Sequence, residues 1–238
     1  MISSQMLWNM GTGLLLFIEL CRLGLKVVVR YTWTPGLPKV KKNKKHIACI
    51  GDSITFGAGV MAHRNRDSYP AMLQKTVGEE YQVLNYGLSG RTLMANGDVP
   101  YTREKHYLET FRTKMDYYIC MLGTNDSKPY NWNEEDYQKE MTEFLSKYKI
   151  FNPNGRVVVM IPPCTFPVKG KEEIAYDIQN DVILQEKEIL QEIVNTLDIQ
   201  MIDLYTYTKD YPEWFPDGVH PNAVGNRNIA EYIAKEIF

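Results

Sequence analysis

Short apolar runs alternate with longer segments of helical periodicity from residue 46 to residue 238, and this alternation limits the fold more than any other feature. Each apolar run has the length of one strand, and most of the runs end at glycine or proline. The apolar runs cover residues 46–50, 81–85, 117–122, 156–161 and 200–204. The segments with helical periodicity cover residues 68–77, 101–113, 134–148, 171–197 and 222–237.

Strands separated by helices pair in parallel, because each helix carries the chain back across the sheet before the next strand begins. The run 157–161 is apolar at every position, which is typical of a parallel strand that is covered on both faces. The sequence therefore predicts an α/β domain of three layers, α/β/α, around a five-stranded parallel sheet. We expect this domain to span residues 46–238 and residues 1–45 to form a separate N-terminal segment.

Polar motifs follow the strands at the edge where an open parallel sheet binds its ligands, outside the carboxyl ends of the strands. A serine, a glycine-rich turn, an asparagine and an Asp/His pair share this edge. The motifs are Gly51-Asp52-Ser53, Ser89-Gly90-Arg91, Gly123-Thr124-Asn125-Asp126 and Asp217-Gly218-Val219-His220. Together they supply the groups that acyl transfer requires: a nucleophile, a base, a group that orients the base, and oxyanion donors.

Each of these groups has a chemical role in the predicted site. The hydroxyl of Ser53 becomes a nucleophile only when a neighbouring imidazole takes its proton, and His220 is the natural base. Asp217, three residues before His220, would hold the second ring nitrogen and stabilise the imidazolium. We assign the oxyanion hole to the backbone N–H groups of Ser53 and Gly90 and to the side-chain amide of Asn125.

Each motif is weak when taken alone. A glycine that ends a strand, an asparagine before a helix and an Asp/His turn are all common in surface loops. Four such motifs in this order, each after the expected strand, are much harder to obtain by accident.

These four motifs resemble those of the SGNH (GDSL-like) hydrolase superfamily, and the resemblance covers about residues 46–238. Longer strings resemble a narrower branch of sialate O-acetylesterase-like proteins and carbohydrate acetylesterases: 89–93, 122–132 and 215–222. The resemblance implies a flavodoxin-like sheet of order 2-1-3-4-5 and a serine esterase of the carboxylic-ester hydrolase class. It also implies that the enzyme uses no metal and no organic cofactor.

The implied strand order makes a geometric demand on the chain. The fifth strand would lie about 14 Å from the first, at about 4.8 Å for each step between strands. His220 therefore reaches Ser53 only through a long connection, and residues 205–220 provide one. Loops of this length are usually functional.

The substrate is less well determined by the sequence. No insertion resembles a lipase lid, which favours a short acyl group, and the branch resemblance favours an O-acetyl ester on a carbohydrate. Arg91 would contact a polar substrate or form a surface ion pair, and Trp132 would stack on a sugar or pack its loop onto the core. We expect Asp126 to brace the loop of Asn125.

Two other functions remain as alternatives. One is a lipid hydrolase of the lysophospholipase or thioesterase kind, which would favour long acyl chains. The other is a non-catalytic module that binds a polar ligand at the same edge of the sheet.

Composition excludes two further classes of function. The formal net charge of −2 argues against a nucleic-acid partner, because domains that bind nucleic acids usually carry a basic excess. The four cysteines form no C-x-x-C pair, so no zinc site is expected. Cys49 and Cys120 lie in apolar runs, where we expect small buried side chains.

The N-terminal segment has three interpretations. It is rich in apolar residues, but charged residues interrupt it. The segment is therefore a poor candidate for a membrane span. An export signal, a membrane contact through residues 1–31 and a helix packed on the domain all remain open, and with them the localisation and the oligomeric state. The interrupting residues are Glu19, Arg22, Lys26 and Arg30.

Overall fold

The computed structural model describes residues 35–168 and 170–238. The predicted segment 1–45 lies mostly outside this part, so the boundary after residue 45 and the membrane contact through residues 1–31 stay predictions. No helix in the described part is both long and apolar enough to cross a membrane.

The five predicted strands form one parallel sheet. The strands lie in the order β2-β1-β3-β4-β5, and every neighbouring pair is parallel. Their bounds are β1 Lys45–Gly51, β2 Tyr81–Asn85, β3 Tyr117–Met121, β4 Arg156–Ile161 and β5 Gln200–Asp203. The structure therefore confirms the predicted sheet and its 2-1-3-4-5 order.

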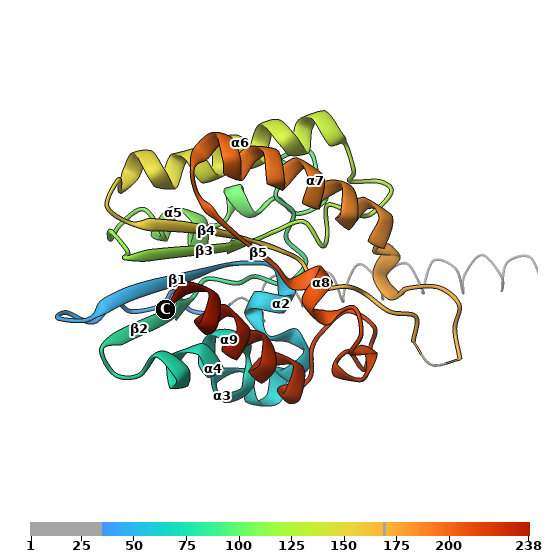
Figure 1. The fold of residues 1–238 in the computed structure, drawn as a ribbon, viewed down its shortest axis with the longest axis horizontal. Coiled ribbons are helices and arrows are strands. Elements are labelled where there is room, and N and C mark those ends of the chain that lie inside the picture. The colour runs from blue at the N-terminus through green and yellow to red at the C-terminus, as the bar shows by residue number, and fades with distance from the viewer. Residues whose placement is uncertain (1–34, 169) are drawn as a thin grey trace, which may run out of the picture. The chain divides into compact units, whose positions relative to one another are not determined.

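Helices cover both faces of the sheet and complete the three predicted layers (Figure 1). One layer contains α5 (Lys105–Glu109), α6 (Glu134–Phe151) and α7 (Asn180–Leu197), and the other contains α4 (Tyr69–Val77) and α9 (Ala223–Ile237).

The strands supply side chains to both interfaces of the sheet. In β1, Ala48 and Ile50 pack in the core under α6 and α7, whereas Ile47 and Cys49 pack in the core under α4 and α9. All four are fully buried. This is why the strands are apolar at successive positions rather than at alternate ones.

Short helices lie in the connections, several of them close to the carboxyl ends of the strands. They are α2 (Ser53–Phe56), α3 (Arg64–Asp67), α8 (Leu204–Thr208) and the 3₁₀ turns Ala58–His63, Tyr101–Arg103, Ala175–Asp177 and Pro212–Trp214. The helix predicted over 101–113 is wrong in extent, because Glu104 is extended and separates a 3₁₀ turn from α5. Tyr101 fixes this turn, since its N–H donates to Thr92 O and its hydroxyl donates to Tyr86 O.

The helix predicted over 171–197 is wrong in its first part, because α7 begins only at Asn180. Ile174 instead forms an isolated bridge with Pro167. Tyr176 and Asp177 have φ angles of 65° and 60°, a left-handed conformation that a right-handed helix excludes. The buried apolar stripe of α7 starts with Val182. Of residues 171–179 only Ile178 is buried, so this stretch has no apolar face that would stabilise a helix by packing.

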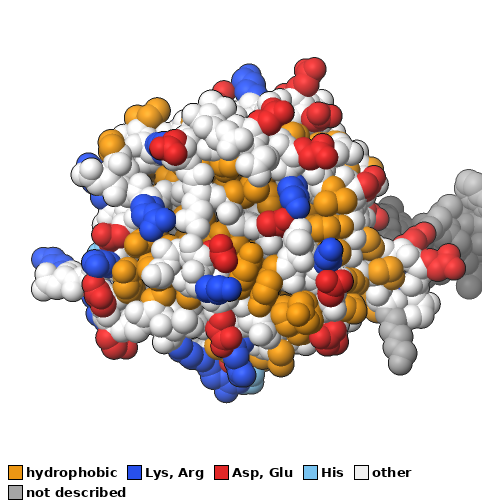
Figure 2. Space-filling view, viewed as in Figure 1, with side chains coloured by type: hydrophobic (Ala, Val, Ile, Leu, Met, Phe, Trp, Pro, Cys, Tyr) orange, Lys and Arg blue, Asp and Glu red, His pale blue; other side chains and the backbone are white. Residues whose placement is uncertain are grey.

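The distribution of charged side chains and the burial of the cysteines agree with what the composition predicts. Acidic and basic side chains are interspersed over the face shown in Figure 2. Cys49, Cys120 and Cys164 are free and buried, and burial raises the pKa of the Cys49 and Cys120 thiols. The prediction of small buried side chains at Cys49 and Cys120 is confirmed.

One buried amide joins the helices of the second layer. Asn226 of α9 is fully buried. Its Oδ1 accepts a hydrogen bond of 2.7 Å from the N–H of Tyr69, and its Nδ2 donates to Pro221 O at 2.7 Å. The carbonyl of Pro221 directly follows His220, so this amide also fixes the end of the Asp/His loop.

We predict that Asn226→Ala lowers the free energy of unfolding by about 2–3 kcal/mol, because it leaves a buried donor and a buried acceptor without partners. Urea unfolding followed by circular dichroism measures the change. Asn228→Ala is the matched control, since Asn228 lies on the same helix and its Nδ2 bonds only the exposed Val224 O. Equal effects of the two substitutions would contradict the prediction.

Candidate active site

Ser53 lies where β1 turns directly into α2. Asp52 is the N-cap of this helix, and its Oδ1 accepts a hydrogen bond of 2.9 Å from the N–H of Ile54. The preceding Gly51 has no room for a side chain, because a Cβ would collide with the carbonyl of Met121 on β3. The Gly-Asp-Ser sequence is therefore a tight strand-to-helix turn that fixes the backbone of Ser53. Ser53 itself is 7% exposed.

Ser53, His220 and Asp217 form one chain of hydrogen bonds. His220 Nε2 lies 2.9 Å from Ser53 Oγ, and His220 Nδ1 lies 2.6 Å from Asp217 Oδ2. The other carboxylate oxygen of Asp217 accepts hydrogen bonds from the backbone N–H groups of Val219 and His220. The structure thus brings together the three residues that the sequence predicts as a catalytic triad, and it orients the imidazole from both sides.

The environment keeps Asp217 ionised. Partial burial alone would raise the pKa of its carboxyl group, but the hydrogen bond and charge of His220 and the two backbone N–H groups outweigh it. The pKa of Asp217 is therefore held well below its ordinary value. An ionised Asp217 can balance a positive charge on His220.

The loop that carries Asp217 and His220 is long, as the strand order requires, and it is anchored at several points. Trp214 and Phe215 are buried. Gly218 adopts φ of 85°, and its carbonyl accepts a hydrogen bond of 2.8 Å from the N–H of Phe166. A side chain at Gly218 would collide with the carbonyl of Phe166, so glycine is required between Asp217 and His220.

The three predicted oxyanion donors lie on loops that contact one another. Ser53 begins a helix, and the first N–H groups of a helix have no acceptor within it. Gly90 has φ of 77° and faces open space, since a Cβ built there meets no atom within 4 Å. Asn125 is 6% exposed, and its Nδ2 donates to Arg91 O at 3.1 Å. An amide nitrogen carries two N–H donors, so the second remains for a substrate oxygen.

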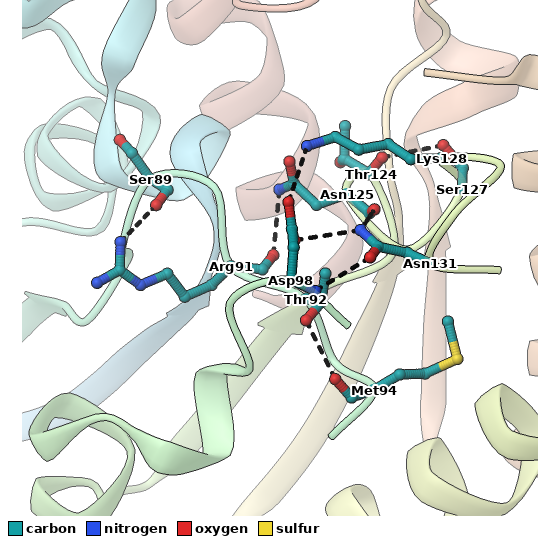
Figure 3. A network of polar contacts seen from close by, with 10 residues as sticks. All are labelled: Ser89, Arg91, Thr92, Met94, Asp98, Thr124, Asn125, Ser127, Lys128 and Asn131. Carbon is teal, nitrogen blue, oxygen red and sulfur yellow. Dashed lines mark hydrogen bonds and ion pairs between the residues drawn. The ribbon is translucent and has the colours of Figure 1, made fainter. Parts of the chain in front are cut away.

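A buried polar network holds the Asn125 loop against the Gly90 loop (Figure 3). Asp126 accepts hydrogen bonds of 2.9 Å from the N–H groups of Leu93 and Met94, which confirms the prediction that Asp126 braces this loop. Asn131 Nδ2 donates to Asn125 O at 2.8 Å, and Asn131 Oδ1 accepts from the N–H of Asp98. The role of Asn131 could not be predicted from the sequence, because an asparagine in a loop carries no signal of the contacts that it makes.

Arg91 forms a buried ion pair, whereas the sequence left a surface ion pair and a substrate contact open. It is 4% exposed, its Nη2 lies 2.9 Å from Glu104 Oε1, and its Nη1 donates to Ser89 O. Trp132 is partly buried and packs with its ring 5.3 Å from that of Tyr137, which favours loop packing. A substrate contact by Arg91 or Trp132 stays a prediction.

Three buried carboxyl groups lie beneath the site: Asp52, Asp126 and Glu186. Burial raises the pKa of Asp52, raises that of Asp126 to about 7, and raises that of Glu186 well above its ordinary value. Both carboxyl oxygens of Glu186 lack a hydrogen-bond partner among the described residues. They occupy the space where a side chain on Gly123 would lie, so Glu186 supports the turn that leads to Asn125.

No set of three or more His, Cys, Asp or Glu side chains within residues 35–168 and 170–238 is arranged to hold a metal ion. The predicted chemistry of the site uses only the side chains and backbone groups described above.

Comparisons with known proteins place the chain in a family. The GDSL-like lipase/acylhydrolase family matches residues 49–227. An acetylxylan esterase of Xylanibacter ruminicola is 32% identical over an alignment of 224 residues, and the match covers 86% of this chain and 45% of that protein. The chain thus spans less than half the length of this curated relative.

Solved structures share the fold at low sequence identity. A carbohydrate acetylesterase from Sinorhizobium meliloti has a TM-score of 0.63 at 20% identity, covering 81% of this chain and 99% of that chain. A lipase/acylhydrolase from Enterococcus faecalis has a TM-score of 0.63 at 21% identity, with coverage of 81% and 95%. The inhibitor-bound aryl esterase of M. smegmatis has a TM-score of 0.62 at 19% identity, with coverage of 81% and 100%. These similarities support the fold.

We predict that Glu186→Gln stabilises the protein relative to wild type, and increasingly so as the pH rises from about 4 to about 8. The raised pKa means that the folded protein keeps a proton that the unfolded chain releases above the ordinary glutamate pKa of 4.5. The unfolding free energy contributed by Glu186 therefore falls as the pH rises, and glutamine removes this loss.

Urea unfolding at pH 4, 6 and 8, values chosen to span the range about and above the ordinary glutamate pKa, measures the effect. Glu188→Gln is the matched control, because Glu188 is exposed on the same helix. A difference between Glu186→Gln and wild type that does not change with pH would contradict the prediction.

Proposed function

The chain belongs to the GDSL-like lipase/acylhydrolase family, and from that premise we propose that it is a serine esterase that removes acetyl groups from a carbohydrate. The observation that carries this proposal is the unbroken chain of hydrogen bonds from Ser53 Oγ through His220 to Asp217. A serine hydroxyl needs such a base to act as a nucleophile at neutral pH.

In the first step, Ser53 Oγ attacks the ester carbonyl carbon while His220 Nε2 takes the hydroxyl proton. The negative charge on the carbonyl oxygen is stabilised by the N–H groups of Ser53 and Gly90 and by the amide of Asn125. The intermediate then expels the alcohol, whose oxygen takes the proton from His220. The acyl group stays on Ser53 as an ester.

In the second step, His220 takes a proton from water, and the resulting hydroxide attacks the acyl-enzyme. The same oxyanion donors stabilise the second tetrahedral intermediate. Its collapse breaks the bond to Ser53 Oγ, which regains a proton from His220, and releases the carboxylic acid. Asp217 keeps its charge throughout and stabilises the imidazolium in both steps.

Two observations favour an acetyl ester of a sugar. The curated relative from X. ruminicola is named an acetylxylan esterase. Ser53 and Asn125 are only 7% and 6% exposed, and access to such buried groups is easier for an ester with a small acyl group. A long-chain lipid ester is the alternative substrate, and a non-catalytic binding module is the alternative without chemistry.

We predict Ser53-dependent turnover of p-nitrophenyl acetate that falls steeply as the acyl chain lengthens from butyrate to octanoate. The initial rate of p-nitrophenol release, compared between wild type and Ser53→Ala, measures this. The substitution should lower kcat by a factor of about 10⁴ or more, because it removes the nucleophile. Rates that rise with chain length would instead indicate a lipid hydrolase. Wild-type rates no higher than those of Ser53→Ala would indicate a binding module.

A further inference from the structure

An exposed tyrosine stands beside the imidazole of His220. Tyr176 lies on the segment that connects β4 to α7, and its side chain is 56% exposed. Its ring centroid lies 5.5 Å from that of His220, at an interplanar angle of 68°. Its hydroxyl lies 3.4 Å from Asp217 Oδ2. More than half of this ring therefore faces solvent at the edge of the candidate active site.

The segment that carries Tyr176 is fixed to both sides of the site. On one side, Phe166 donates to Gly218 O, which lies between Asp217 and His220. On the other, the N–H of Gln179 donates to Ser127 Oγ at 3.2 Å, next to the Asn125 loop. The neighbouring Ile178 is 4% exposed and packs in the core. The position of Tyr176 is thus set by contacts with the two loops that carry the base and the oxyanion donor.

Tyr176 also adopts an unfavourable backbone conformation, with φ of 65°. Such conformations persist only where the surrounding contacts impose them, and they concentrate at functional sites and ligand clamps. This conformation places a large aromatic ring in solvent, where it gains little from packing.

The reaction geometry defines what lies next to this ring. The carbonyl oxygen of the ester points toward Gly90 and Asn125, and the alcohol oxygen must lie within hydrogen-bond reach of His220 Nε2 to take its proton. The alcohol part of the ester therefore extends from His220 toward solvent, and Tyr176 lies beside this path.

The exposed ring has a carboxylate next to it. Asp177 directly follows Tyr176 in the chain and is exposed as well. An aromatic face with a carboxylate beside it suits a sugar, which presents C–H groups on its face and hydroxyl donors at its rim. An alkyl chain would gain nothing from this carboxylate and would have to displace its water.

We propose that Tyr176 is the platform of a subsite that binds the pyranose ring of the leaving alcohol and thereby determines the preference for carbohydrate esters. This inference rests on the proposed esterase function and adds to it the residue that recognises the sugar. Asp177 lies at the rim of the subsite.

The test compares Tyr176→Ala and Tyr176→Phe with wild type on two acetate esters. Methyl 2,3,4-tri-O-acetyl-β-D-xylopyranoside carries a pyranose leaving group, whereas ethyl acetate carries none. Tyr176→Ala should lower kcat/KM for the xyloside about tenfold more than kcat/KM for ethyl acetate, mainly through a higher KM, because only the xyloside loses an aromatic contact with its pyranose ring. Tyr176→Phe keeps the ring and should keep the wild-type ratio of kcat/KM for the two esters.

Ile150→Ala is the control for loss of an exposed apolar side chain, since Ile150 is 78% exposed near the end of α6. If Tyr176→Ala lowers kcat/KM equally for both esters, or does not lower it for the xyloside, the subsite proposal is wrong. Ser53-dependent hydrolysis in the same assay would still support the esterase proposal. Equal defects in Tyr176→Phe and Tyr176→Ala would also overturn it, because they would assign the effect to the hydroxyl near Asp217. Absence of Ser53-dependent hydrolysis of either ester by wild type would overturn both proposals.

Discussion

The hydrogen bond between His220 Nε2 and Ser53 Oγ joins residues that lie 167 positions apart in the sequence, and the rest of the site depends on it. Ser53 follows β1, which has two neighbours in the sheet, whereas His220 lies beyond β5 at the edge. The loop after β5 must therefore cross the ends of β3 and β4. Three features of this loop fix the position of His220: its buried aromatic residues, the hydrogen bonds from the turn to Asp217, and the left-handed conformation of Gly218. The buried Asn226 of α9 holds the carbonyl that follows His220.

The second constraint is the buried polar support beneath the loops. Each loop must expose polar groups to a substrate, so its own backbone cannot be held by apolar packing alone. Asp126 and Asn131 provide the missing hydrogen bonds, and they connect the Asn125 loop to the loop after β2. Glu186 reaches from α7 to the Gly123 turn of the same loop. Buried carboxyl groups without cationic partners reduce stability, and here they lie directly under the predicted oxyanion hole.

Much of this architecture could be predicted from the sequence, because the strands are short, continuous apolar runs and the chemistry follows them in chain order. All five strands and their order agree with the structure, and the triad residues lie within hydrogen-bond distance. The conformation of the segment before Asn180 could not be predicted. Its charged composition is typical of a helix, but tertiary contacts impose a left-handed backbone conformation at Tyr176. The buried ion pair of Arg91 and the contacts of Asn131 depend on how loops meet in space, which periodicity does not report. The same holds for Tyr176, whose position beside His220 is set by a β4–α7 connection with no motif of its own.

The central claim is that Ser53 is a nucleophile activated by His220, and covalent labelling tests it most directly. Wild-type protein is incubated with a fluorophosphonate probe, and the adduct is located by intact mass and peptide mapping. We predict a single adduct on Ser53, no adduct in Ser53→Ala, and labelling slowed by a factor of about 10³ or more in His220→Ala, which lacks the base. Labelling of another residue, or labelling of Ser53 at the same rate without His220, would contradict it.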